Sequence, residues 1–414
     1  MTRSVCRPPA WGILSLVLSL FALNPMMVNE AAGVNMDVIP SVRLEEGWNS
    51  NVFNSSTNEV SSFGTRLTPG LGLRLTSPED VSILLTGNYE ILRYHDSDAE
   101  EADSDTWFFR LNSTGAWAFT PNLSMTPSVY YLNTNDSYRR TQLVPSGDPV
   151  LPPVTITNYG RTNTENFGGA LDFSYRMTPS ATIGVNGNYS EQRFTDSASD
   201  SGLTDSTTIG GNASVSYQFS PRTKIGILFA GNHQTYDNAP DSDTLSGGIL
   251  FGYQFSPTLL LDGVLGMSYI RQKEAPGIPE EKEAAPSGRI TLSYTSETFT
   301  ATVYGSAVYS GGSGFGEATR QWTAGLLCSD QFARDWSWNL GGSYQVSQSV
   351  FVTDAVDTNT IYVTARLSYK PWVWGTLDLT GNMDRQTSDG QFGDSLNNYS
   401  VILGFTVGRP FKIL

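Results

Sequence analysis

Tyr217-Gln218-Phe219-Ser220-Pro221 and Tyr253-Gln254-Phe255-Ser256-Pro257 are two copies of a stretch that recurs along this chain of 414 residues. Related copies end at Pro121 and Pro179, and weaker ones follow near residues 294, 331 and 369, most of them spaced by about 36 to 43 residues. Proline cannot donate to a strand ladder, so each copy ends a strand. The spacing fits two strands, a tight turn and a longer loop. The sequence therefore predicts a long antiparallel meander.

Runs with alternating polarity predict eighteen strands in a single architecture, because no linker or charge block divides the chain. Short turns and longer polar loops alternate between them. An even strand number with short turns on one rim and long loops on the other is typical of outer-membrane β-barrels. The predicted strands lie near residues 37–47, 61–76, 81–93, 105–119, 123–134, 162–177, 181–194, 206–219, 223–236, 243–255, 258–271, 287–295, 299–310, 320–332, 336–348, 358–369, 372–385 and 397–409.

Each predicted strand has one apolar and one polar face. In the stretch 245–255, Leu245, Ile249 and Phe251 alternate with Ser246, Gly248 and Leu250, and the same register continues with Gly252 and Gln254. Such alternation places the two kinds of side chain on opposite faces of a sheet. The hydrophobic fraction of 39% is below the usual range of about 45–50%, as expected for a barrel with a polar interior.

Arginines in the polar register decide which face meets lipid. Arginine on the lipid face costs about 2–4 kcal/mol at the bilayer midplane, so these side chains are expected to point into the lumen. The predicted pore-lining residues are Arg43, Arg66, Arg74, Arg110, Asp172, Arg176, Asp262, Arg289, Tyr304, Tyr362, Arg366 and Asp378, with Asp384, Tyr130 and Trp374 in the same register.

Aromatic residues gather at the ends of the predicted strands and are expected to form two interfacial girdles. The girdle beside the short turns comprises Trp117, Phe119, Tyr175, Tyr217, Phe219, Phe255, Phe332, Trp336, Trp338, Tyr369 and Trp372. The candidates for the second girdle are Trp107, Tyr131, Tyr189, Tyr269, Tyr309, Trp322 and Tyr344.

The N-terminus is typical of an export signal. Arg3 and Arg7 precede an apolar run from Trp11 to Leu23, which is too short for a transmembrane helix but suits a signal peptide. We expect a signal peptide over residues 1–32 and a barrel domain over residues 33–414. Only Cys328 then remains, and a single thiol forms no internal disulfide.

A soluble β-propeller or a β-solenoid is the alternative fold, because propeller blades also repeat at about 40 residues. A blade needs four short strands per repeat, whereas each repeat here holds two long ones. Strands of this length can cross a bilayer at a tilt, which favours the transmembrane barrel.

The sequence contains no pattern that predicts an enzyme, a cofactor site or a metal centre. His95 and His233 lie at strand ends, where polar rim residues are expected, and Gly312 to Gly316 joins two strands with no helix to follow. No haem-attachment motif occurs. The net charge of −15 argues against nucleic acid as a partner, because phosphate binding needs a basic surface.

Two kinds of loop are candidates for function. Residues 96–105 carry a dense group of carboxylates; they form either a solvated rim or a site where Ca²⁺ or Mg²⁺ bridges to lipopolysaccharide phosphates. The connector 135–161, with four prolines, is the candidate constriction or plug of the lumen. Without such a plug, eighteen strands enclose an aqueous channel.

The predicted first strand, Val38 to Phe53, resembles that of bacterial outer-membrane β-barrels encoded with exopolysaccharide or PEP-CTERM systems. Leu67-Thr68-Pro69-Gly70-Leu71 and the recurrent aromatic-x-aromatic-Ser-Pro turns extend the likeness over the mature chain. The C-terminus departs from the common barrel ending, since Phe411 stands three residues before Leu414. The resemblance implies outer-membrane lipid and lipopolysaccharide as surroundings, and it assigns no substrate residue.

Three functions remain open at the sequence level. The resemblance implies a passive conduit for exopolysaccharide that works with a periplasmic export protein. A general diffusion porin for small solutes is the second candidate. The third is a closed structural barrel whose loops bind surface polymers. A lumen that mixes arginine, carboxylate and aromatic side chains suits sugars, but internal ion pairs and water satisfy the same residues equally well.

Overall fold

The computed structural model describes residues 35–76, 82–114, 117–134, 162–194, 203–274, 279–310, 318–351, 356–390 and 395–412. The expected signal peptide, the connector 135–161 and the glycine loop Gly312 to Gly316 lie outside these residues.

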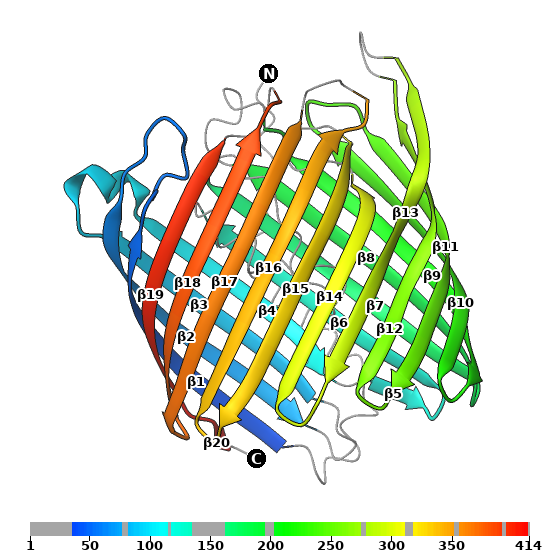
Figure 1. The fold of residues 1–414 in the computed structure, drawn as a ribbon, viewed down its shortest axis with the longest axis horizontal. Coiled ribbons are helices and arrows are strands. Elements are labelled where there is room, and N and C mark those ends of the chain that lie inside the picture. The colour runs from blue at the N-terminus through cyan, green and yellow to red at the C-terminus, as the bar shows by residue number, and fades with distance from the viewer. Residues whose placement is uncertain are drawn as a thin grey trace.

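The described chain forms a closed antiparallel barrel of 18 strands (Figure 1). Its 20 strand segments form a single sheet, in which β5 continues β4 and β20 continues β19. The segments are β1 Asn35–Asn49, β2 Ser62–Thr76, β3 Ser82–Tyr94, β4 Ser104–Thr114, β5 Trp117–Thr120, β6 Leu123–Thr134, β7 Thr164–Thr178, β8 Ala181–Phe194, β9 Ser206–Ser220, β10 Thr223–Tyr236, β11 Ser242–Ser256, β12 Leu259–Gln272, β13 Glu281–Thr295, β14 Phe299–Ser310, β15 Thr319–Ala333, β16 Trp336–Ser349, β17 Asp357–Trp372, β18 Gly375–Ser388, β19 Leu396–Gly408 and β20 Phe411–Lys412.

The barrel closes at the pairing of β1 with β19, which we call the seam. The register matches Leu44 with Phe405 and Trp48 with Val401. β20 lengthens the seam, since Val38 pairs with Phe411. Closure removes the unpaired strand edges that an open sheet would expose in lipid. It thereby confirms the fold class expected from the sequence.

Two irregularities interrupt the regular strand pairing. The strand expected over 105–119 consists of β4 and β5, both of which pair with β6. Pairing between β2 and β3 is interrupted between Leu67 and Gly70. Pro69 lies in this gap, and proline has no N–H to donate to a neighbouring strand.

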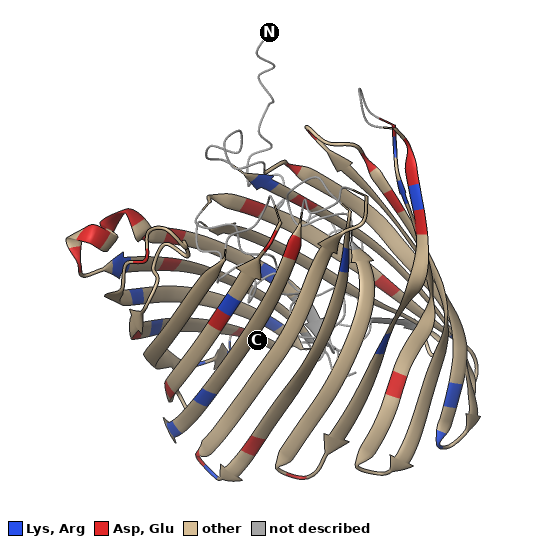
Figure 2. Cartoon of the chain, turned by 45° about the horizontal axis from the view of Figure 1, so that its top comes forward, with Lys and Arg blue, Asp and Glu red and all other residues tan. Residues whose placement is uncertain are grey.

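The rims differ as the sequence predicts. One carries the short turns, such as residues 221–222 between β9 and β10, and the other carries the longer loops. The loop after β3 contains the 3₁₀ helix η1, Ser97–Ala102. Ala99 and Ala102 of η1 pack on Val52 of the preceding long loop. Figure 2 shows η1 as a largely acidic projection, whereas most of each strand carries no charge.

Apolar side chains cover the outer face. Leu44, Leu71, Ile249 and Leu403 are among many large apolar residues exposed there. Exposed aromatic residues lie at both ends of the strands, namely Tyr175, Tyr217, Phe219, Phe255, Phe332, Trp336 and Trp372 beside the short turns and Trp107, Tyr189, Tyr269, Trp322 and Tyr344 near the long loops. An apolar band between aromatic girdles is the lipid-facing surface of an outer-membrane barrel.

Two aromatic assignments made from the sequence are wrong. Tyr309 is buried in a small cluster with Ile270 and Ala318 instead of facing lipid. Trp374 does not belong to the inner wall, because it lies in the turn after β17 and stacks on Trp372 with 5.1 Å between ring centroids. A turn interrupts the two-residue alternation on which the prediction relied. The side chains of Trp117 and Phe119 lie outside the described part of the structure.

The protein is an outer-membrane β-barrel. In the described residues no helix is both long and apolar enough to cross a membrane.

Candidate functional site: the inner wall of the barrel

The inner wall is the candidate functional site, since alternate residues of every strand point into the lumen. The registers between strands show which inner-facing residues are neighbours: Arg43 lies opposite Thr406, Arg366 opposite Thr380, and Asp262 opposite Thr291. The alternation places all the residues predicted to line the pore on this inner face, namely Arg43, Arg66, Arg74, Arg110, Asp172, Arg176, Asp262, Arg289, Tyr304, Tyr362, Arg366 and Asp378. Their contact with a solute stays a prediction.

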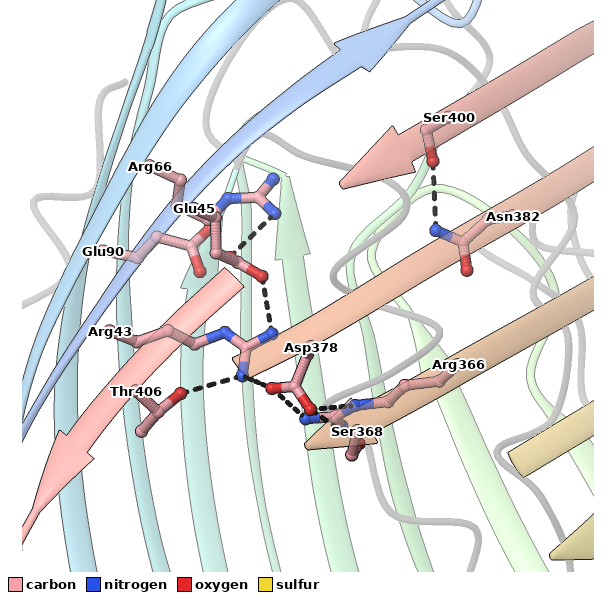
Figure 3. Close-up of polar contacts among 10 residues, drawn as sticks. All are labelled: Arg43, Glu45, Arg66, Glu90, Arg366, Ser368, Asp378, Asn382, Ser400 and Thr406. Carbon is pink, nitrogen blue, oxygen red and sulfur yellow. Dashed lines mark hydrogen bonds and ion pairs between the residues drawn. The ribbon is translucent and has the colours of Figure 1, made fainter. Parts of the chain in front are cut away.

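Six charged side chains from β3, β2, β1, β18 and β17 form a ladder of alternating sign on this wall (Figure 3). In order, the ladder consists of Glu90, Arg66, Glu45, Arg43, Asp378 and Arg366. Successive members are joined by ion pairs of 3.1, 3.5, 2.8, 3.0 and 2.6 Å. The ladder crosses the seam, because Glu45 and Arg43 belong to β1 and Asp378 belongs to β18, with β19 between them.

Asp378 accepts hydrogen bonds from three side chains. Its Oδ1 accepts hydrogen bonds from Arg366 Nε at 3.0 Å and from Ser368 Oγ at 2.7 Å. Its Oδ2 accepts a hydrogen bond from Arg43 Nη1 at 3.0 Å, and that nitrogen also donates to Thr406 Oγ1 at 3.1 Å. One carboxylate therefore orients two guanidinium groups that come from strands on either side of it.

Burial within the ladder is uneven. The side chain of Asp378 is 1% exposed, whereas those of Arg43 and Arg366 are 25% and 41% exposed. The carboxylate thus lies at the base of the wall and the guanidinium groups extend toward water. The ladder is electrically balanced, with three arginines and three carboxylates, but it presents mainly hydrogen-bond donors to the lumen.

A cavity of about 440 Å³ lies over the ladder. Thr68, Asn88, Thr106, Thr364 and Thr380 supply hydroxyl and amide groups to it, and Phe108 supplies one aromatic ring. The cavity therefore combines donors, acceptors and an aromatic face on neighbouring strands.

A second, larger cavity of about 860 Å³ follows the inner face of β9 to β14. Its lining includes Asp262, Arg289 and Lys224, with glycine and serine between them. Ser268 Oγ lies 2.6 Å from Ser246 Oγ and donates to Ser287 Oγ at 2.7 Å, which links three strands through hydroxyl groups. Large apolar side chains, among them Leu228, Leu250 and Val264, complete the lining, so charged groups are a smaller part of this wall than of the ladder.

The structure brings only part of the predicted set together. Arg43, Arg66, Arg366 and Asp378 meet in the ladder, whereas Asp172 is separate and accepts a hydrogen bond from Asn186 Nδ2 at 2.7 Å. Arg289 and Asp262 line the larger cavity. The remaining predicted residues, Arg74, Arg110, Arg176, Tyr304 and Tyr362, belong to β2, β4, β7, β14 and β17.

Sequence reasoning did not assign Glu45 or Glu90 to the lumen. Glu45 has the same parity as Arg43 on β1, so strict alternation could have identified it. Glu90 becomes recognisable only once the register between β2 and β3 is known, because nothing local marks it as the partner of Arg66.

The rim with the long loops carries ion pairs of its own. Arg93 Nη1 contacts Asp105 Oδ1 at 3.0 Å, and His233 Nδ1 lies 2.7 Å from Asp243 Oδ1. In the loop before β13, the hydrogen bond from Lys282, with further contributions from Arg271, lowers the pKa of Glu280. In the loop before β9, burial raises the pKa of Asp205, whose carboxylate accepts the backbone N–H of Phe194 at 2.8 Å.

The acidic stretch 96–105 is partly engaged within the protein. Asp103 and Asp105 pair with Arg93, while Asp98, Glu100 and Glu101 remain exposed on or beside η1. Within the described ranges, no group of three or more His, Cys, Asp or Glu side chains is arranged to hold a metal ion. A bridge from this loop to lipopolysaccharide stays a prediction.

No family model and no curated protein matches the chain. Among solved structures, OpdK of Pseudomonas aeruginosa, determined with vanillate, is 10% identical, with 90% of this chain and 99% of OpdK covered and a TM-score of 0.45. OpdF of the same organism is 13% identical, with 90% and 98% covered and a TM-score of 0.46. A BenF-like porin of Pseudomonas fluorescens is 11% identical, with 92% and 99% covered and a TM-score of 0.46. The strand pairing and closure of the chain itself, rather than these likenesses, establish the barrel.

Proposed function

We propose that the protein is a passive channel for hydrophilic solutes across the outer membrane. The observation that supports this function best is the polar inner wall of a closed barrel of 18 strands. Barrels of this strand number are wide enough to enclose an aqueous passage. The cavities of about 440 and 860 Å³ on that wall accommodate solutes of the size of a sugar unit. Nothing in this mechanism requires a catalytic group.

Reconstitution of the purified barrel into a planar bilayer tests the channel. We expect discrete single-channel currents in KCl and, in liposome-swelling assays, entry of small uncharged sugars. Absence of both would contradict the channel and would favour a closed barrel that acts through its surface loops. Heat-denatured protein at the same concentration is the control for detergent leakage.

The more specific proposal is that the solute is a secreted polysaccharide chain delivered by a periplasmic export protein. Two features support it: the resemblance of the first strand and turns to barrels encoded with exopolysaccharide systems, and a wall rich in hydroxyl and amide groups. Sugars bind through many hydrogen bonds, and such a wall offers donors and acceptors along its length. A passive barrel supplies no energy, so a periplasmic partner has to feed the chain.

Deletion of the gene distinguishes this proposal from a general porin. Polysaccharide that accumulates in the periplasm and returns to the medium upon complementation supports the conduit. Normal secretion together with slower uptake of small solutes contradicts the conduit and identifies a general diffusion porin.

A further inference from the structure

Two buried oxygen atoms near the long-loop rim have no hydrogen-bond donor. They are Oδ1 of Asp384 on β18 and Oδ1 of Asn398 on β19. The two residues are direct partners in the register of these strands, and both belong to the inner face. A buried acceptor without a donor costs about 1–3 kcal/mol. Each of these two oxygens is therefore stabilised by a cation or by a donating group that reaches it.

The amide of Asn398 cannot provide that donor by rotating. Its Nδ2 already donates to the backbone carbonyl of Asn51 at 3.1 Å and to Oδ1 of Asn54 at 2.5 Å. Turning the amide by 180° would place its oxygen against both of those acceptors. The orientation of this amide, with Oδ1 turned away from the two acceptors, is therefore fixed by the loop after β1.

That loop is held against the start of β19 by hydrogen bonds. The N–H of Asn54 donates to the carbonyl of Asn51 at 3.1 Å, and Asn54 has a φ of 50°, a left-handed conformation that asparagine tolerates. Asn51 Nδ2 in turn donates to the carbonyls of Ser55 at 2.8 Å and Asn397 at 3.4 Å. The loop is thus tied to the start of β19 beside the orphaned oxygens.

A cavity of about 50 Å³ adjoins these atoms. It is lined by oxygen-bearing side chains, including Glu45, Asn49, Asn54, Asn382 and Ser400, together with Asp384 and Asn398. Glu45 and Arg66 in this lining already belong to the balanced ladder, so the carboxylate of Asp384 is the charge in the lining that the ladder does not neutralise. This space admits a single ion with a water molecule or two.

We infer that Asp384 and Asn398 bind a hard cation, Ca²⁺, under the loop that follows β1. Carboxylate, amide and backbone oxygens are the ligands that Ca²⁺ prefers, and it accepts irregular sets of six to eight of them, completed by water. A bound Ca²⁺ satisfies both orphaned oxygens and neutralises the excess charge of the cavity. It also joins β18, β19 and the loop from β1, so it fixes that loop against the barrel beside the seam. The site does not depend on which solute crosses the barrel.

Terbium luminescence tests the site, because Trp48 and Tyr94 line the cavity and their excitation sensitises a Tb³⁺ ion bound there. With the full folded protein, we expect saturable Tb³⁺ emission that Ca²⁺ displaces, and a rise in thermal unfolding temperature on addition of about millimolar Ca²⁺. For Asp384→Asn, which keeps the shape of the side chain, the apparent affinity should fall by about tenfold or more.

Two further variants separate a site from general electrostatics. Asp172→Asn removes an equal charge from the inner wall on β7, away from the cavity, and should bind as the wild type does. Asn382→Asp adds a carboxylate to the lining and should tighten binding, an effect that a folding defect does not produce. Equal affinity in wild type and Asp384→Asn, or no Ca²⁺-dependent stabilisation of the wild type, overturns the inference and leaves water between the two oxygens.

Discussion

At the scale of single residues, Asp378 accepts hydrogen bonds from Arg43, Arg366 and Ser368 on the inner wall. It holds Arg43 and Arg366 in place while remaining almost completely covered. A buried carboxylate is stabilised only when its charge is paired and its oxygens are hydrogen-bonded. Both conditions are met here, and the two guanidinium groups consequently point a fixed set of donors toward the lumen.

Replacing Asp378 with asparagine should therefore change both stability and ion selectivity. Asp378→Asn leaves Arg366 without the carboxylate it contacts in the ladder, and we expect the free energy of unfolding to fall by about 1–3 kcal/mol. The loss stays in this range because the arginines regain contact with water. The lumen gains net positive charge, so the zero-current potential across a KCl gradient should shift toward anion selectivity. Asp172→Asn, which removes an equal charge outside the ladder, should destabilise less. Unchanged selectivity in Asp378→Asn would mean that the ladder does not face the conducting path.

At the scale of a strand, alternate side chains meet two different solvents. On β11, Ile249 is 59% exposed on the outer face, and its neighbour Leu250 lines the larger inner cavity. The residues are adjacent and nearly equal in size and polarity, so composition does not distinguish them. Their surroundings distinguish them, because the side chain of Ile249 meets hydrocarbon and that of Leu250 meets the lumen.

This pair yields a matched comparison. Ile249→Arg should destabilise the barrel in lipid vesicles, with the free energy of unfolding falling by about 2–4 kcal/mol, the cost of arginine at the lipid face. Leu250→Arg should cost clearly less, because its guanidinium reaches water in the lumen. Reversible urea titration of the barrel in vesicles, followed by tryptophan fluorescence, measures both. Equal losses would contradict the assignment of the two faces.

At the scale of the whole molecule, closure makes one wall from residues far apart in sequence. Pairing of β1 with β19 brings Arg43 within 3.0 Å of Asp378, across 335 positions of the chain. The ladder, the cavity above it and the proposed Ca²⁺ site all lie at or near this seam. In an unclosed sheet the ladder would be divided between Arg43 and Asp378, because that ion pair is the one that crosses the seam.

A disulfide across the seam tests the closing register. Val42 and Val407 are direct partners there, at a separation suited to a disulfide. With Cys6 and Cys328 replaced by serine, the double variant Val42→Cys with Val407→Cys should cross-link on mild oxidation and stay compact on gel electrophoresis in denaturant. The pair Val42→Cys with Thr406→Cys has its side chains on opposite faces and should not cross-link. Cross-linking in the second pair alone would show a register shifted by one residue.

Much of the barrel could be predicted because its signals are local. Proline after an aromatic pair ends a strand, as at Pro221 and Pro257, and these turns lie at the ends of β9 and β11 as expected. The arginine at position 66 could be assigned to the lumen from its parity alone. Predictions were wrong where alternation stops, as at Trp374 in a turn, or where a loop cluster buries a rim residue, as at Tyr309.

The amino-acid sequence by itself determined the strand number, the two rims and the face on which most strand residues lie, because period-two alternation and turn chemistry act within a few residues. Only the tertiary structure decided that Glu90, Arg66, Glu45, Arg43, Asp378 and Arg366 form one ladder, and that Asp384 is paired in register with Asn398. Those contacts depend on the registers between strands and on the closing of β1 against β19. The register between β1 and β19 arises from pairing of residues far apart in the sequence, which no local pattern encodes.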